Sequence, residues 1–171
     1  MGHSREAFEN VRNQIGCCGL WCGSCAVGNG SVARAARDLR DLLTSYDVPN
    51  WGTLDMSWES FLDAVTSLEG SVSCVGCRKG GGRGNCEIRA CADGRGVTNC
   101  TDCGSFGVCT QQPIVEHMRS GAARVGMVML SPGDAPGAMI EAWSRTVTQR
   151  WPTCLVFADN ERRHLDGGEN D

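Results

Sequence analysis

The strongest constraint on this chain is the number and spacing of its cysteines. There are 12 cysteines in 171 residues. The stretch 74–109 reads CVGCRKGGGRGNCEIRACADGRGVTNCTDCGSFGVC and carries Cys74, Cys77, Cys86, Cys91, Cys100, Cys103 and Cys109. A shorter group, CCGLWCGSC, carries Cys17, Cys18, Cys22 and Cys25. Because C-x-x-C turns commonly present thiolates to a metal ion, the pattern predicts a small domain held together by metal.

The cellular compartment decides whether such cysteines bind metal or form disulfides. The first residues, MGHSREAFENVRNQ, are polar and lack the apolar segment of a signal peptide. We therefore expect a cytoplasmic protein, in which reducing conditions disfavour a disulfide scaffold and favour metal binding. The chain also lacks a run of about 18 apolar residues, so we expect no membrane-spanning helix and no membrane partner.

Length and composition indicate one globular domain, since 41% of the residues are hydrophobic and 21% are charged. We expect the domain to cover 1–159, followed by a polar tail over 160–171. Within it, we expect a metal lobe from 16–30 and 70–110, a helical excursion over 31–69, and a helical C-terminal part over 111–159. The expected fold class is mainly α, a small metal-stapled domain with cysteine knuckles and at most short β-strands.

Apolar residues at helical spacing predict a pair of helices between the two cysteine groups. The clearest pattern runs from Val32 to Tyr46, preceded by Ser31 as a candidate N-cap. A second helix is expected from about Ser57, ending at Gly70. The two helices should form an αα-hairpin, with Trp51 in the connection serving as a packing residue.

Other segments are predicted more briefly. Short or amphipathic helices are expected over 1–16, over 87–92, from Pro113, and from Pro136 with Asp134 as its cap. The segment VGMVML at 125–130 fits either a short strand or a buried helix, and the run 153–158 fits a short strand.

A structural zinc site needs four thiolate or imidazole ligands. The pairs Cys74/Cys77 and Cys100/Cys103 have a separation suited to such a site, but Cys86, Cys91 and Cys109 could interleave, so the pairing stays open. In the first group, the three thiols of Cys18, Cys22 and Cys25 need a fourth ligand, which a cysteine of the second group would supply. Metal would then join the two ends of the segment 31–69. The predicted ligands are Cys18, Cys22, Cys25, Cys74, Cys77, Cys86, Cys91, Cys100, Cys103 and Cys109.

These ten cysteines suggest two Zn²⁺ ions with four thiolates each, and two further cysteines that are either free or part of a cluster with bridging thiolates. The alternative cofactor is a 4Fe–4S cluster, because the spacing C-x3-C-x2-C at Cys18, Cys22 and Cys25 also occurs in radical S-adenosylmethionine enzymes. That enzyme class itself is excluded, since the chain lacks the length and the repeated βα units of its barrel. Cys17 and Cys154 are expected to be non-ligands.

Basic residues lie around the second cysteine group: Arg78, Lys79, Arg83, Arg89 and Arg95. They could contact nucleic acid, as in a zinc finger, or offset the negative charge of thiolate sites. The net charge of −4 favours the second interpretation, so nucleic acid is not the favoured partner. His117, on a helix close after Cys109, could be a metal ligand, but a position on the helix surface or in the core is favoured. The chain carries no recognised catalytic motif, and we do not favour an enzyme.

The order and spacing of these motifs resemble a family of uncharacterised cysteine-rich microbial domains. The similarity rests on CGLWCGSC, then C-x-x-C, then CEIRACA, then GVTNCTDCGSFGVC, over residues 16–110. One residue more separates Phe106 from Cys109 here than in the family pattern. The resemblance implies zinc or iron–sulfur binding and no particular activity.

We therefore expect a cysteine-ligated metal-binding protein. The leading hypothesis is a structural zinc protein that serves as a binding or interaction module for a protein partner. The alternative is an iron–sulfur protein in electron transfer or redox sensing. A third possibility is an enzyme with a reactive cysteine such as Cys17.

Overall fold

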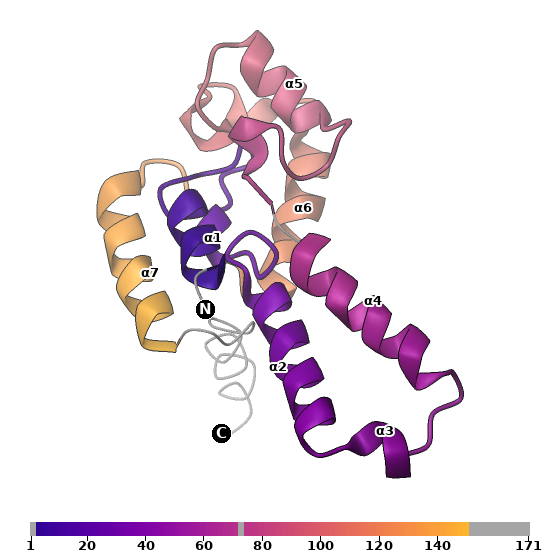
Figure 1. The fold of residues 1–171 in the computed structure, drawn as a ribbon. Coiled ribbons are helices and arrows are strands. Elements are labelled where there is room, and N and C mark those ends of the chain that lie inside the picture. The colour runs from indigo at the N-terminus through magenta and orange to yellow at the C-terminus, as the bar shows by residue number, and fades with distance from the viewer. Residues whose placement is uncertain (1–2, 72–73, 151–171) are drawn as a thin grey trace, which may run out of the picture.

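Helices make up nearly all of the regular structure of the protein (Figure 1). The computed structural model describes residues 3–71 and 74–150. Its helices are α1 (His3–Val11), α2 (Ser31–Ser45), α3 (Val48–Trp51), α4 (Trp58–Ser71), α5 (Glu87–Gly94), α6 (Gln112–Arg124) and α7 (Pro136–Arg150). Single 3₁₀ turns are η1 (Cys22–Ser24), η2 (Cys77–Lys79), η3 (Cys100–Asp102) and η4 (Phe106–Val108). Within the described ranges there is no β-strand, only isolated bridges. The prediction of a mainly α fold is confirmed.

The helices predicted around the cysteine groups form where expected. α5 covers the predicted segment 87–92, α6 begins one residue before Pro113, and α7 begins at Pro136. None of the helices in the described part of the chain is long and apolar enough to span a membrane. The run 153–158, Cys154 and the tail 160–171 lie outside the described residues.

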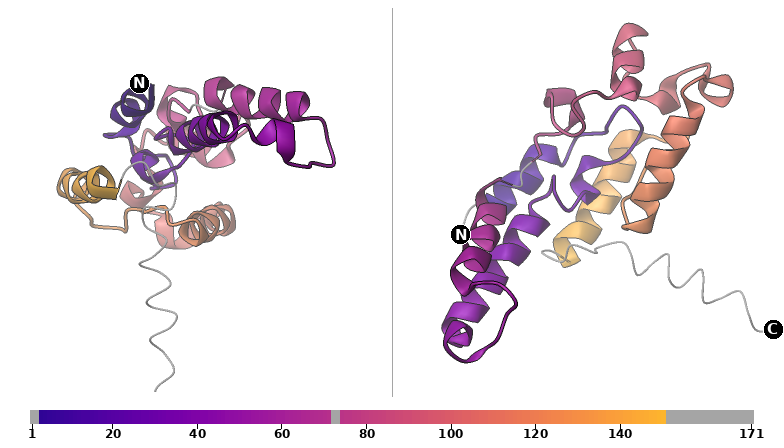
Figure 2. Two further views of the ribbon diagram at one scale, coloured as in Figure 1. Left: turned by 60° about the horizontal axis from the view of Figure 1, so that its bottom comes forward. Right: turned by 90° about the vertical axis from the view of Figure 1, so that its right-hand side faces the viewer.

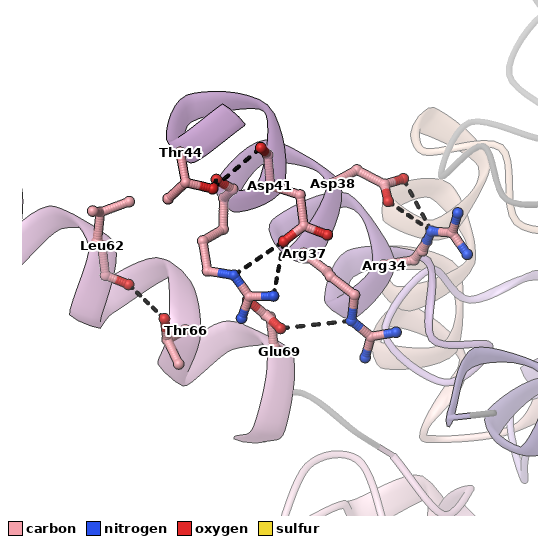
Figure 3. Close-up of polar contacts among 9 residues, drawn as sticks. Arg34, Arg37, Asp38, Asp41, Thr44, Leu62, Thr66 and Glu69 are labelled. Carbon is pink, nitrogen blue, oxygen red and sulfur yellow. Dashed lines mark hydrogen bonds and ion pairs between the residues drawn. The ribbon is translucent and has the colours of Figure 1, made fainter. Parts of the chain in front are cut away.

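α2 and α4 form a hairpin, hereafter the arm (residues 31–71), which extends away from the end of the molecule that carries α5 (Figures 1 and 2). Ion pairs join its two helices. Glu69 on α4 lies 2.6 Å from Arg40 Nη1 and 3.6 Å from Arg37 Nε, both on α2. Figure 3 shows Glu69 directed from α4 toward Arg37. The predicted αα-hairpin is therefore present and is held by charge as well as by its apolar faces.

Three details of the arm differ from the predictions. Ser31 is the first residue of α2 rather than its N-cap, and the buried Asn29 side chain accepts the Ser31 N–H at 3.0 Å. α4 continues through Gly70 to Ser71, so Gly70 does not end the helix. Trp51 does not serve as core packing, because it is 69% exposed and donates its indole N–H to the Tyr46 carbonyl. It lies at the tip of the arm and belongs to neither of the two apolar clusters of the protein.

The first of two apolar clusters surrounds Trp21, which is fully buried. Its ring meets Phe8 edge-on at 6.3 Å and lies 5.5 Å from the ring of Trp143, measured between centroids. The indole N–H donates to the Arg12 carbonyl at 2.6 Å. This one side chain therefore joins α1, the first cysteine group and α7.

The segment 127–130 is extended and pairs with the first cysteine group. Leu20 and Met129 form an antiparallel bridge, the Trp21 N–H donates to the Val128 carbonyl, and the Leu130 N–H donates to the Gly19 carbonyl. Neither a short strand nor a buried helix, the two alternatives predicted for VGMVML at 125–130, forms there; the segment makes only an isolated bridge at Met129. Its function is to anchor the cysteine loop at 17–22.

The second apolar cluster is built largely from the cysteine segments themselves. Its buried members are Cys17, Ile88, Ala92 and Val115. Around them pack Cys18, Cys77, Cys86, Cys100, Val97, Phe106, Ile114 and Met118. α5 and α6 thus close over the cysteines from two sides, and the thiols take the place of aliphatic side chains in this part of the core.

Candidate functional site

The fold sorts the predicted cysteines into two groups, each lining a cavity. The small cavity, of about 20 Å³, lies between α5 and the start of α6. Its thiols are Cys91, Cys100, Cys103 and Cys109. The large cavity, of about 440 Å³, is lined in part by α6. Its thiols are Cys17, Cys18, Cys22, Cys25, Cys74, Cys77 and Cys86.

Turns at 99–111 position three of the four thiols of the small cavity. Asn99 is buried and its side-chain oxygen accepts the Thr101 N–H at 2.9 Å, which starts η3. The Cys103 N–H donates to the Cys100 carbonyl at 3.2 Å, so the C-x-x-C pair closes into a tight turn. The Gln111 N–H donates to Cys109 Sγ at 3.4 Å. Backbone contacts within these turns therefore set the positions of the Cys100, Cys103 and Cys109 side chains.

Charge around the small cavity is also suited to thiolates. The pKa of Arg95 is raised, first by Cys91 and then by Cys103, which places its guanidinium beside two of the four sulfurs. Burial, followed by the nearby Cys18 and Cys109, raises the pKa of Cys100 to about 11. The cavity therefore combines a desolvated thiol at Cys100 with one cation that can offset a negative centre.

Close backbone approach shapes the large cavity. A Cβ at Gly81 would lie 2.8 Å from Cys74 Sγ, and one at Gly16 would lie 3.4 Å from Cys77 Sγ. Cys77 Sγ accepts the Cys17 N–H at 3.2 Å and lies 3.7 Å from Cys17 Sγ. The glycines thus leave room that side chains would otherwise fill, next to the sulfurs.

Burial desolvates three thiols of the large cavity, those of Cys17, Cys18 and Cys22. Burial first, and Cys77 second, raise the pKa of Cys22 to about 12. The same two causes raise the pKa of Cys17 to about 12, and burial raises the pKa of Cys18. These shifts mean that a metal ion would have to displace protons from neutral thiols when it binds.

The loop that carries Cys74 and Cys77 is held by the basic residues noted in the sequence. Arg89 donates to the carbonyls of Cys77, Gly81, Arg83 and Gly84 at 2.8–3.2 Å. Arg78 pairs with Asp93 at 3.0 Å, and Lys79 donates to Asn10. These contacts tie Arg78, Lys79 and Arg89 to other parts of the chain and hold the loop in place.

The arrangement of the thiols adds two findings to the sequence prediction. The C-x-x-C pairs Cys74/Cys77 and Cys100/Cys103 lie at different cavities, and Cys18, Cys22 and Cys25 share theirs with Cys74, Cys77 and Cys86. Across the described ranges, no three His, Cys, Asp or Glu side chains are gathered closely enough around one point to hold a metal ion as they stand. The thiols line the cavity walls, so ligation would require them to move inward.

Sequence reasoning assigned no role to several residues that position the site. Arg119 on α6 donates to the Leu130 carbonyl at 2.7 Å and to the Cys18 carbonyl at 3.3 Å, which fixes the cysteine loop against the segment 127–130. The Cys100 N–H donates to the Cys17 carbonyl at 2.8 Å and joins the two cavities. His117 is exposed on α6, as predicted, at the rim of the large cavity. No sequence signal marked Arg119 or Asn99.

Comparison with known proteins identifies the family. Residues 14–113 match the model described as Protein of unknown function (DUF3795). The match covers more than half of the chain, so the protein belongs to this family, and the expectation of an uncharacterised family is confirmed. The matched region contains both cysteine groups and the arm, and ends at the start of α6. No curated protein and no solved structure matches the chain.

Proposed function

We propose that this member of the DUF3795 family binds metal ions through cysteine thiolates and acts as a structural zinc protein with an interaction role. The observation that carries the proposal is the small cavity, where one cysteine from α5 and three from the turns at 99–111 line one space, with Arg95 beside two of them. Four thiolates and one Zn²⁺ form a closed site with a charge of about −2. Such a site leaves no coordination position for a substrate, which favours a structural role over a catalytic one.

The small volume supports zinc rather than a cluster at this cavity. Zn–S bonds are about 2.3 Å long, so one tetrahedral ion fits among four thiols that move inward by a short distance. A 4Fe–4S cluster would require more room than about 20 Å³ provides without opening α5 away from α6. Coupling of metal binding to local folding would supply the inward movement.

A reducing cytoplasm is the setting that this proposal implies. All eleven cysteines in the described part of the chain are free thiols, and thiols at such density stay reduced only where glutathione and thioredoxin act. We place the protein there because an oxidising compartment would turn near neighbours such as Cys17 and Cys77 into disulfides.

The tip of the arm is the surface that we assign to a protein partner. Tyr46 and Trp51 are 71% and 69% exposed, and Leu54 and Met56 beside them are exposed as well. Asp47 and Asp55 are exposed in the same segment. Aromatic residues with an acidic surround favour a protein partner whose contact surface is apolar with a basic rim.

Metal analysis of the purified full chain tests the zinc proposal. The protein is prepared without oxygen, and zinc, iron and sulfide are measured together with the visible spectrum. We expect colourless, zinc-loaded protein, and loss of about one zinc per chain when Cys91 and Cys103 are both changed to Ser. Cys154→Ser, a cysteine that the sequence assigns to neither group, is the control. Folded protein without thiolate-bound metal would refute the proposal, and brown protein with iron and sulfide would replace zinc by the iron–sulfur alternative.

A further inference from the structure

The large cavity carries more thiols than one tetrahedral ion can use. After Cys91, Cys100, Cys103 and Cys109 are assigned to the small cavity, six of the ten predicted ligands remain, and all six line the large one. A single zinc ion would take four of them and leave two unused beside it. The metal site of the large cavity therefore has to account for two more thiols than one zinc ion can bind.

We propose that the large cavity holds a binuclear zinc centre in which two Zn²⁺ ions share six thiolates, from Cys18, Cys22, Cys25, Cys74, Cys77 and Cys86. The inference rests on the proposed function, because it takes thiolate–zinc binding by this chain as its premise. Two tetrahedral ions need eight metal–sulfur bonds, and six thiolates provide eight when two of them bridge. Proteins use this arrangement of two zinc ions and six cysteines elsewhere.

Charge favours two ions over one. Six thiolates with a single dication would leave about −4 in a mostly apolar cavity, whereas two dications reduce this to about −2. Two guanidinium side chains, Arg83 and Arg89, line the same cavity and match that remaining charge. The small cavity follows the same rule on a smaller scale, with one cation near two of its four thiols.

The volume and the origin of the thiols agree with this. About 440 Å³ is far more than the small cavity offers, and no three of the six thiols lie close enough around one point to hold a metal ion as they stand. They come from the loop at 18–25, from the turn at 74–77, and from Cys86 directly before α5. A centre with two ions could be reached from all of these segments, whereas a single ion would have to draw them to one position.

Cys77 lies where the turn at 74–77 meets the loop at 17–25, which makes it the natural bridging thiolate. Its sulfur lies 3.7 Å from Cys17 Sγ, in the loop that also carries Cys18 and Cys22. The Cys17 N–H also donates to it at 3.2 Å. Cys17 itself is 2% exposed and packs against Ile88, so we assign it to the core and leave its thiol outside the ligand set. Substitution of Cys17 is therefore a matched control for substitution of the neighbouring cysteine ligands.

The experiment is to count zinc ions in the full chain by elemental analysis and native mass spectrometry after anaerobic loading. We expect about three zinc ions per chain, which fall to about one when Cys22 and Cys74 are changed to Ser. The variant with Cys91→Ser and Cys103→Ser should keep about two. Cys17→Ala, which retains the backbone N–H, should keep all three. Cobalt substitution adds a second readout, because two ions bridged by thiolate couple magnetically and a lone ion does not.

Each other outcome overturns a defined part of the reasoning. Two zinc ions per chain, with the loss of one in the Cys22/Cys74 variant, would make the large cavity mononuclear and refute the inference while the proposed function stands. Iron and sulfide bound at the large cavity would refute it as well. Zinc lost only in the Cys91/Cys103 variant would show that the large cavity binds none. A folded wild-type chain without bound metal would refute the proposed function itself.

Discussion

Replacement of Gly81 by Ala tests whether the loop at 74–81 holds a metal ligand in a defined position. A Cβ at this residue would lie 2.8 Å from Cys74 Sγ, and 2.9 Å from the Gly76 nitrogen. Non-bonded heavy atoms prefer about 3.5–4.0 Å, so the sulfur or the loop must move by about 1 Å. Metal ligands tolerate deviations of only about 0.2 Å. A displacement of this size should therefore weaken metal binding without removing a ligand.

The expected result is a fall of about 10- to 100-fold in zinc affinity at the large cavity, which is the scale for changes that disturb the setting of a ligand. The assay is zinc retention against a competing chelator, followed by metal content per chain. Zinc at the small cavity should be unaffected, because its thiols come from residues 91–109. Thermal unfolding of the metal-free chain, measured in parallel, shows how much of the loss is general destabilisation.

Gly84→Ala is the matched control. Gly84 lies in the same loop and its carbonyl is held by the same guanidinium, since Arg89 donates to Gly81 and to Gly84. A Cβ at Gly84 would meet nothing within 4 Å. Equal zinc retention in wild type and both variants would refute the steric argument. Equal loss in both variants would show that the loop as a whole matters, rather than the approach to Cys74.

Packing and charge give three further predictions. Trp21→Ala should lower the free energy of unfolding by about 3–5 kcal/mol, because Trp21 is fully buried, whereas Trp51→Ala should change it by less than about 0.5 kcal/mol. Chemical denaturation measures both values, and a large loss at Trp51 would mean that the tip of the arm is structural. Glu69→Gln should lower the melting temperature more than Asp38→Asn does, because the Glu69 side chain is 12% exposed and joins two helices, whereas Asp38 pairs with Arg34 within α2. Similar shifts in the two variants would contradict this reasoning. Arg95→Ala should weaken zinc retention at the small cavity on the order of tenfold and leave retention at the large cavity unchanged, which chelator competition measures. Retention equal to wild type would show that Arg95 does not contribute to the site.

Local features of the chain were predictable because they depend on residues close in sequence. The helix at 31–45 follows from apolar residues on one face, and α5 follows from the short segment between Cys86 and a glycine-rich turn. α7 begins at Pro136, where a proline is tolerated and the preceding segment breaks. Caps were less predictable. Asn29 rather than Ser31 satisfies the start of α2, since both are good cap residues and the choice depends on the turn at Gly30.

Burial of single side chains could not be inferred, because it depends on which segments meet. Trp21 and Trp51 are the same residue type in short connecting segments, yet one is fully buried and the other is 69% exposed. Trp21 is enclosed by α1 and α7, which are far apart in sequence, and by the extended segment 127–130. The tip of the arm has no such neighbours.

The sequence by itself determined the chemistry of this protein, and only the tertiary structure decided how that chemistry is divided. Residue type and clustering make ten of the twelve cysteines candidate ligands, and C-x-x-C spacing predicts tight turns at some of them. The same spacing occurs at Cys74/Cys77 and at Cys100/Cys103, so no local rule can tell which thiols share a space. The path of the arm returns Cys74 and Cys77 to the loop at 18–25, while α5 and α6 enclose the remaining four. Which thiols become neighbours is thus set by packing between distant segments, which the cysteine pattern does not encode.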